Sequence, residues 1–266
     1  MKIQPNKKTK KTVFKVIEKA DIVLEILDSR DPESFRNKKI EQIITKQGKK
    51  LILVINKTDL VPREIVEKWK KKLEKEYPTV YMSSKDRHGT RILRKTILKY
   101  APKIPVKVAL VGYPNVGKSS IINVLKGKHS AATSPTPGFT KHSQLFRISP
   151  KILILDTPGV YPPEDEKSLM LKSALEVEKI DDPITHALEL LKFIRKKNPD
   201  ELLKVYGIEP SDDLDFLEKL AIKRGRLLKG GIPDVEEIAK IILRDWQKGK
   251  IVIWKEPNEN SNTLSK

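Results

Sequence analysis

The sequence predicts an α/β domain followed by a small all-helical domain, and two observations support this division. Up to residue 160, short apolar runs alternate with amphipathic helical patterns, which is typical of a mostly parallel sheet between two layers of helices. After Pro162 and Pro163, apolar residues recur only at helical spacing. We therefore expect an α/β domain over residues 1–163, a helical domain over residues 164–256 and a disordered polar tail over residues 257–266.

Five apolar runs rich in Val, Ile and Leu predict the strands of the sheet. They cover residues 21–28, 50–56, 79–84, 106–112 and 151–156. Amphipathic stretches between them predict helices over residues 36–48, 63–76, 90–100 and 118–127. Residues 142–148 closely precede the last strand and predict a β-hairpin with one antiparallel edge strand. Residues 249–257 predict either a short closing strand or an extended strap.

The composition excludes several classes of protein. The 266 residues are 38% hydrophobic, so the chain can bury a core, and they include no cysteine, which excludes disulfide frameworks and thiolate metal sites. No apolar run has the length of a membrane span, and the basic N-terminal segment lacks the apolar core of a signal peptide. We expect a cytoplasmic monomer without a membrane partner.

The charge of the chain is strongly basic and unevenly distributed. The formal net charge is +19, and residues 1–163 carry 35 Lys and Arg against 14 Asp and Glu, whereas the remaining residues have a small acidic excess. A positive field of this size attracts polyanions. RNA is the expected partner, DNA is not expected, and the alternative is a solvated lysine surface.

A glycine-rich loop at residues 112–119 is the strongest motif. Gly112, Gly117, Lys118 and Ser119 complete the pattern G-x-x-x-x-G-K-S between a predicted strand and a predicted helix. In such a loop, backbone N–H groups surround phosphate oxygens, the lysine neutralises β- and γ-phosphate charge, and the serine hydroxyl binds Mg²⁺. Nucleotide contacts are expected from Tyr113, Pro114, Asn115, Val116, Gly117, Lys118, Ser119 and Ser120.

Two later segments complete the predicted Mg²⁺ and γ-phosphate site. The stretch D-T-P-G follows the last predicted strand, so Asp156 can hold Mg²⁺ through water and the Gly159 N–H can meet the γ-phosphate, with Thr157 and Pro158 between them. Thr140 is the best candidate for a switch threonine, and its rivals are Thr136 and Thr133. The predicted Mg²⁺ ligands are Ser119, Thr140 and Asp156, and the predicted catalytic residues are Lys118, Thr140 and Gly159.

The stretch N-K-T-D at residues 56–59 predicts recognition of a guanine base. The Asp59 carboxylate can accept from both N1–H and the 2-amino group of guanine, and adenine lacks this pair of donors. The Lys57 stem can lie over the base, and Asn56 can hold neighbouring loops together. A second loop matches the one whose backbone N–H contacts guanine O6 near Ser84, and it comprises Ser83, Ser84 and Lys85.

These motifs occur in an unusual order, because the base motif and the S-S-K loop precede the phosphate loop, the switch threonine and D-T-P-G. This order resembles that of the circularly permuted ribosome-assembly GTPases, the YlqF/YawG-type family of TRAFAC-class P-loop GTPases. Residues 20–32 are similar to the D-A-R-x-P stretch of that family, with Ser29 in place of alanine. Residues 223–251 resemble the end of its C-terminal helical domain.

The resemblance implies a GTPase that hydrolyses GTP to GDP and phosphate with slow intrinsic turnover. It also implies coupling to rRNA and to precursors of the large ribosomal subunit, with an RNA-contacting helical domain. The alternative is a GTP-gated RNA-placement module with negligible hydrolysis. Some members of the family carry an N-terminal histidine that is implicated in hydrolysis, and the N-terminal segment here has none. In addition, Val160 stands where a water-orienting glutamine would follow Gly159. Asn115 resembles the asparagine that binds K⁺ in related GTPases, and a plain loop hydrogen bond is the alternative.

Overall fold

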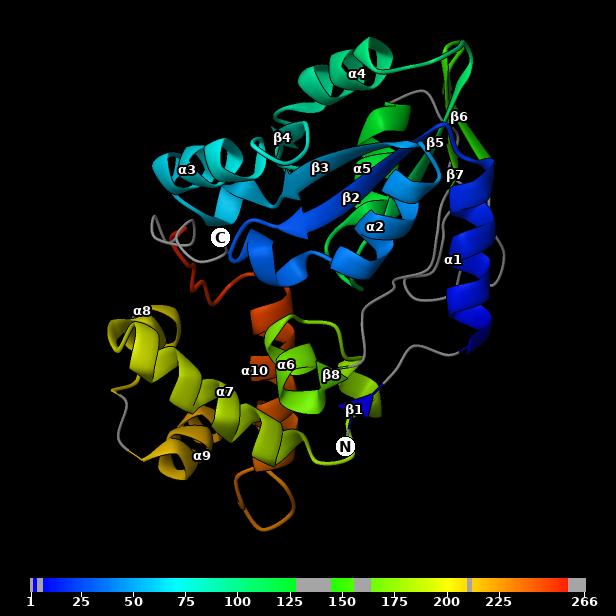
Figure 1. Cartoon of the computed structure of the whole chain (residues 1–266). Coiled ribbons are helices and arrows are strands. Elements are labelled where there is room, and N and C mark those ends of the chain that lie inside the picture. Colours follow the sequence, from blue (N-terminus) through cyan, green and yellow to red (C-terminus); the bar gives the residue numbers. More distant parts are fainter. Residues whose placement is uncertain (1, 4–6, 128–144, 156–163, 210–211, 258–266) are drawn as a thin grey trace, which may run out of the picture. The chain divides into compact units, whose positions relative to one another are not determined.

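The computed structural model describes residues 2–3, 7–127, 145–155, 164–209 and 212–257. The chain forms two compact units that alternate along the sequence (Figure 1). The α/β unit comprises residues 4–163 and 254–266, and the helical unit comprises residues 1–3 and 164–253. This division differs from the expected boundaries, because residues 2–3 pair with residues 164–165 and residues 254–256 belong to the α/β unit.

The α/β unit is built on a six-stranded sheet with the strand order β4-β3-β2-β5-β7-β6. Its strands are β2 (Ile22–Asp28), β3 (Lys50–Asn56), β4 (Thr79–Tyr81), β5 (Val106–Val111), β6 (Leu145–Ser149) and β7 (Ile152–Leu155). β6 pairs with β7 in antiparallel orientation and the other pairs are parallel. The predicted mostly parallel sheet with one antiparallel edge strand is therefore confirmed. β4 ends at Tyr81, earlier than expected. The Met82 N–H still donates to the Ile55 carbonyl oxygen of β3 at 2.8 Å, and the chain then turns so that Ser83 forms an isolated β-bridge with His88.

β2 lies in the interior of the sheet, beside the strand that leads into the base motif. It lies between β3 and β5, and all seven of its residues are buried, as is typical of a parallel strand covered on both faces. The strand register pairs Asp28 with Asn56, so β2 and β3 end side by side. The carboxyl ends of the parallel strands thus meet at one edge of the sheet, where ligands bind in open α/β sheets.

Five helices of the described residues belong to the α/β unit, namely α1 (Lys7–Lys19), α2 (Lys38–Lys46), α3 (Arg63–Leu73), α4 (Thr90–Lys99) and α5 (Lys118–Lys126). The sequence predicted the last four. α1 lies in the basic segment for which no helix was predicted, because lysines dominate its first half. Its second half buries Val13, Val16 and Ile17, which are spaced three and four residues apart on one face.

The helical unit contains β1 (Lys2–Ile3), β8 (Glu164–Asp165), α6 (Glu166–Leu171), α7 (Pro183–Lys197), α8 (Asp200–Tyr206), α9 (Asp213–Lys223) and α10 (Val235–Gln247). Side chains from α7, α9 and α10 form its core, including Leu190, Phe216 and Ile242. Residues 249–257 form no strand, so the predicted closing strand is absent; residues 249–251 form a turn and a bend, and residues 252–257 have no regular secondary structure. None of the helices in the described residues is long and apolar enough to cross a membrane.

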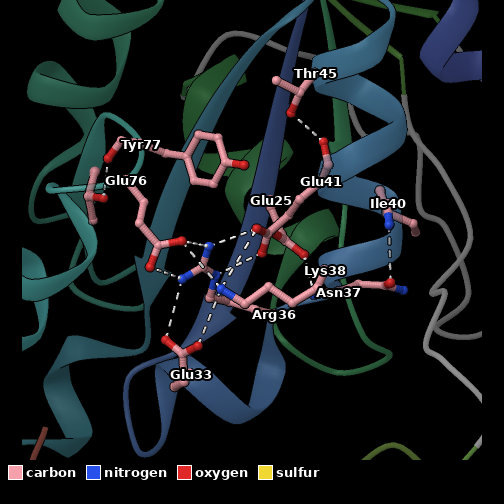
Figure 2. A network of polar contacts seen from close by, with 11 residues as sticks. Glu25, Glu33, Arg36, Asn37, Lys38, Ile40, Glu41, Thr45, Glu76 and Tyr77 are labelled. Carbon is pink, nitrogen blue, oxygen red and sulfur yellow. Dashed lines mark hydrogen bonds and ion pairs between the residues drawn. The ribbon is translucent and has the colours of Figure 1, made fainter. Parts of the chain in front are cut away.

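A network of charged side chains connects β2 with α2 and with the turn after α3 (Figure 2). The Arg36 guanidinium donates to both carboxylate oxygens of Glu41 at 2.7 Å and to the oxygens of Glu76 at 2.7 and 2.9 Å. Glu25, in the middle of β2, accepts a hydrogen bond from the Asn37 N–H at 2.7 Å. The Asn37 side chain also caps the N-terminus of α2. Bidentate contacts with a guanidinium are directional, so the network fixes α2 against the sheet.

The network shifts the pKa values of its carboxyl groups in opposite directions. Burial raises the pKa of Glu25 to about 8, and the nearby Glu41 carboxylate adds to this effect. Hydrogen bonding to Arg36 lowers the pKa of Glu76 to about 2. The folded protein therefore favours a protonated Glu25 and an ionised Glu76 at neutral pH.

We expect Glu25 to make the protein less stable as the pH rises from 5 to 8. A carboxyl group whose pKa is raised on folding stabilises the fold below its unfolded pKa of 4.5 and loses this contribution as the pH approaches about 8. Glu25→Gln retains an acceptor for the Asn37 N–H but does not titrate. Its free energy of unfolding should therefore fall less steeply than that of the wild type, by up to about 1.4 kcal/mol per pH unit.

Urea unfolding at several pH values between 5 and 8 measures this difference in slope. Glu64→Gln is the control, because Glu64 lies on the exposed face of α3 outside the network, and it should keep the wild-type slope. Equal slopes for wild type and Glu25→Gln would contradict a raised pKa for Glu25.

Candidate nucleotide-binding site

The phosphate loop, residues 112–119, connects β5 to α5 and depends on its glycines. Gly112 has a φ of +141° and Gly117 a φ of +98°, which L-residues with a side chain rarely adopt. A Cβ atom at Gly112 would lie 2.6 Å from the Ile26 carbonyl oxygen, and one at Gly117 would lie 2.3 Å from Asn56 Nδ2. The loop can therefore follow this path only with glycine at both positions.

Lys118 begins α5 and its side chain folds back over the loop. The ammonium donates to the carbonyl oxygens of Gly112 at 3.1 Å and Tyr113 at 2.6 Å, and the residue is buried. Tyr113 contributes backbone to the loop, whereas its ring is buried and packs edge-on against Phe35. A cation held over the start of a nine-residue helix forms a favourable site for anionic oxygens.

Asn56 joins the base motif to the two other loops. Its side-chain amide donates to the Val116 carbonyl oxygen at 2.9 Å and accepts from the Ser84 N–H at 3.2 Å. Its own carbonyl oxygen accepts from the Ser29 N–H at 2.9 Å, and Asn56 has no exposed surface. Asn56 and Val116 are 60 residues apart in the sequence. The N-K-T-D stretch and the phosphate loop therefore occupy one site, although the base motif comes first along the chain.

The remaining base-motif residues are held by short polar contacts. Lys57 adopts a left-handed φ of +63°, and its ammonium lies 2.9 Å from Asp28 Oδ2. Burial lowers the pKa of Lys57, and the attraction of Asp28 opposes this effect. The Asp59 carboxylate accepts from Ser83 Oγ at 2.8 Å and lies 4.0 Å from the Lys85 ammonium. The contact with Ser83 leaves acceptor capacity on Asp59 for a ligand.

Three of the predicted segments thus lie together at the carboxyl ends of β3, β4 and β5, whereas a fourth group lies outside the described residues. That group comprises Thr140 with its rivals Thr133 and Thr136, and Asp156, Thr157, Pro158 and Gly159. Among the predicted Mg²⁺ ligands, only Ser119 is therefore placed. It is exposed in the first turn of α5, beside Ser120, and its hydroxyl fits the oxygen ligands that Mg²⁺ prefers.

The structure adds residues to the site that had no predicted role, namely Asp28, Ser29 and Arg30. The sequence contained two indirect signals. Asp28 ends a predicted strand, so the three residues reach the same edge of the sheet as Asn56, and they lie in the stretch that resembles D-A-R-x-P. Their spacing alone could not show that they contact Lys57.

Comparison with known proteins agrees with this arrangement. The family model described as "50S ribosome-binding GTPase" matches residues 107–216. The match begins in β5 and includes the phosphate loop, whereas the base motif and the S-S-K loop lie before it. This is the permuted order that the motifs predicted.

The chain is 44% identical over 250 residues to a GTP-binding protein of Methanocaldococcus jannaschii, which covers 92% of this chain and 66% of that protein. It is 38% identical over 250 residues to nucleolar GTP-binding protein 2 of Neurospora crassa, which covers 90% of this chain and 40% of that protein. The chain thus spans only part of the length of these relatives.

Among solved structures, YlqF from T. maritima in its GNP-bound form matches with a TM-score of 0.67 and 27% identity, over 95% of this chain and 99% of that one. Its GDP-bound structure matches with a TM-score of 0.66. The permuted motif order, the shared fold and the sequence relatives show that this chain belongs to the circularly permuted P-loop GTPases of ribosome biogenesis, together with YlqF and the nucleolar GTP-binding proteins.

Proposed function

We propose that this protein hydrolyses GTP slowly to GDP and phosphate, and that the cycle is coupled to rRNA in large-subunit assembly. The observation that carries the proposal is the buried Asn56 amide, which holds the base motif against the phosphate loop. One ligand that carries both a base and phosphates would occupy the two parts of this site.

The base end of the site supports selection of guanine. Asp59 retains acceptor capacity beside its contact with Ser83, and the two donors of guanine N1 and N2 match such a carboxylate. Ser84 is the expected donor to guanine O6. Its N–H donates to Asn56 Oδ1 at 3.2 Å, so it would share this bond with the base or exchange it for the base on binding.

The phosphate end supports triphosphate chemistry. Lys118 would exchange the loop carbonyls that it now contacts for β- and γ-phosphate oxygens and neutralise their charge. Ser119 would hold Mg²⁺ with Thr140 and Asp156, and the metal ion when bound neutralises further phosphate charge. Thr140 and Gly159 would complete the catalytic set at the γ-phosphate.

Alternatives exist for the role in hydrolysis and for the role of Asn115. Val160 cannot orient water as a glutamine does, so a GTP-gated RNA-placement module with negligible hydrolysis is the second candidate function. Asn115 adopts a left-handed φ of +59° and is exposed, which suits either a K⁺ ligand or a loop hydrogen bond.

The exposed face of α4 is the better of two candidate RNA surfaces. Arg91, Lys95 and Lys99 are exposed there, while Leu93 and Ile97 are buried. Arg94 donates to the Leu125 carbonyl oxygen, so it fixes α4 beside α5.

The competing basic residues lie on and after α9, where protein groups engage three of them. Lys219 pairs with Asp215 at 2.6 Å, Lys223 donates to two carbonyl oxygens at 2.8 and 2.9 Å, and Arg224 lies 3.7 Å from Asp245. These cations are less available for phosphates than Arg91 and Lys95 on α4.

The names of the relatives support the proposed setting. Several are nucleolar GTP-binding proteins, and the matched family model is described as binding the 50S ribosome. We propose rRNA and large-subunit precursors as partners of a monomer, and cytoplasmic location stays a prediction.

Asp59→Asn should lose guanine selectivity. An amide cannot accept from both guanine donors, so GTP affinity should fall at least tenfold, or ~1.4 kcal/mol, while weak ATP binding should hardly change. Equilibrium titration with labelled GTP and ATP measures both. Asp86→Asn is the matched control, because Asp86 also contacts Ser83 Oγ, at 3.3 Å, but lies outside the base motif. Equal GTP and ATP affinities in the wild type would refute guanine recognition.

Large-subunit precursor particles should raise GTP turnover at least tenfold over that of the protein alone. A bound particle can supply the group that orients water, which Val160 cannot do. Single-turnover measurements with and without particles test this, and Lys118→Ala should remove the stimulated rate. Turnover that stays negligible while GTP still governs RNA binding would favour the placement module.

Arg91→Glu combined with Lys95→Glu should weaken binding of large-subunit rRNA and flatten its dependence on salt, because fewer counterions are released. Filter binding over a series of KCl concentrations measures both effects. Arg226→Glu combined with Lys229→Glu applies the same charge change in the helical unit and is the matched comparison. A loss confined to this second pair would assign the RNA surface to the helical unit.

A further inference from the structure

Asp28 is a buried carboxylate beside the base motif. It ends β2, opposite Asn56 in the parallel register, and is 1% exposed. Its Oδ1 accepts from Arg30 Nε at 2.9 Å and from the Arg30 N–H at 3.1 Å. Its Oδ2 accepts from Arg30 Nη2 at 2.9 Å and lies 2.9 Å from the Lys57 ammonium. One carboxylate therefore holds the side chains of both Arg30 and Lys57.

The charges of this group depend on one another. Burial opposes ionisation of Asp28, but Arg30 and Lys57 outweigh it and hold the pKa of Asp28 well below its usual range. Replacing a buried carboxylate by a neutral group leaves its cationic partners uncompensated, and such partners move or bind water. The Lys57 side chain is thus kept in place by Asp28.

The next residue holds the backbone of the base motif. Ser29 Oγ donates to the Lys57 carbonyl oxygen at 2.7 Å, and the Ser29 N–H donates to the Asn56 carbonyl oxygen at 2.9 Å. Lys57 needs this support because its left-handed φ of +63° is uncommon for a residue with a long side chain. Residues 28–30, here called the D-S-R segment, therefore fix both backbone and side chain of Lys57.

The D-S-R segment is in turn attached to the strap, residues 254–257. The Lys255 N–H donates to the Arg30 carbonyl oxygen at 2.8 Å, and its ammonium lies 3.7 Å from Asp31. The buried Trp69 donates its indole N–H to the Lys255 carbonyl oxygen at 2.7 Å. The strap directly follows Ile253, the last residue of the helical unit.

We propose that Asp28 is a positioning residue that holds Lys57 for contact with the guanine base, and that the strap supports it through the backbone of Arg30. The inference rests on the proposed guanine site. It assigns to the D-S-R segment a share of the base affinity, although none of its side chains needs to touch the nucleotide.

Asp28→Asn tests the first part, because it keeps the shape and removes the charge. GDP affinity of the full chain should fall at least tenfold, while the affinity for inorganic pyrophosphate, a probe of the phosphate loop alone, stays within twofold of wild type. Inosine diphosphate lacks the 2-amino group that Asp59 recognises. Asp28→Asn should therefore weaken GDP and inosine diphosphate equally, whereas Asp59→Asn should change their ratio.

The outcomes distinguish the positioning role of Asp28 from the proposed guanine site. A wild type that binds pyrophosphate but shows no preference for GDP would overturn the proposed guanine site. A wild type that prefers GDP, with Asp28→Asn unchanged, would overturn only the positioning role. Parallel loss of GDP and pyrophosphate binding in Asp28→Asn would show a general structural role and would also overturn it.

The strap provides a second test that leaves Asp28 intact. Lys255→Pro removes the N–H that Arg30 accepts, so GDP affinity should fall several-fold with pyrophosphate affinity retained. Lys255→Ala keeps this N–H and removes only the ammonium beside Asp31, so it is the matched control and should bind GDP as the wild type does. Equal GDP affinities for the proline and alanine variants would overturn the supporting role of the strap.

Discussion

The nucleotide site depends on one buried amide. Asn56 offers a donor and an acceptor on the same short side chain and uses them on two different loops. An aspartate there would place a negative charge against the Val116 carbonyl oxygen, and an apolar residue would leave buried backbone groups unsatisfied. The same contact requires glycine at position 117, because a Cβ would occupy the place of the amide nitrogen. The shape of the phosphate loop and the base motif are therefore mutually dependent.

β2 shows how local partners decide the charge of buried acids. Glu25 and Asp28 are three residues apart on this strand and are equally buried. Burial raises the pKa of Glu25 and the neighbouring Glu41 carboxylate adds to this effect, whereas the two cations that surround Asp28 outweigh burial and lower its pKa. Burial is common to both, so the neighbouring charges determine the outcome. The strand thus holds a neutral acid beneath α2 and an anion beside the base motif.

The sequence allowed much of the fold to be predicted, because its signals were local. The periodicity of β2, β3 and β5 and the glycines of the phosphate loop each act within a few residues. α1 was not predicted, because lysines fill its first half and the helical spacing of Val13, Val16 and Ile17 is confined to its second half. The early end of β4 also depends on contacts outside the strand, because Ser83 pairs with His88 and donates to Asp59. The same holds for Asp28, whose partner Lys57 is close in space only because β2 and β3 are parallel neighbours.

The assignment of cations to RNA shows a similar limit. Lys219, Lys223 and Arg224 are close together in the sequence, but carboxylates and backbone carbonyl oxygens engage them. The number of charges indicates the strength of the electrostatic field. Whether a cationic side chain can bind an RNA phosphate depends on whether it already has a partner in the protein. Because Arg91 and Lys95 are exposed on α4, the face of α4 is the stronger candidate.

The alternation of the two units along the chain has a consequence for synthesis on the ribosome. The strap belongs to the α/β unit, yet it is made after the entire helical unit. The sheet, α2 and the phosphate loop can form while the chain is still emerging. The hydrogen bonds of the Arg30 carbonyl oxygen and the Trp69 indole N–H with Lys255 can form only after Lys255 has been synthesised. A nascent chain that stops within the helical unit therefore has the loops of the nucleotide site without their last support. Cutting the chain between residues 163 and 164 would likewise yield two fragments, each lacking part of its own unit.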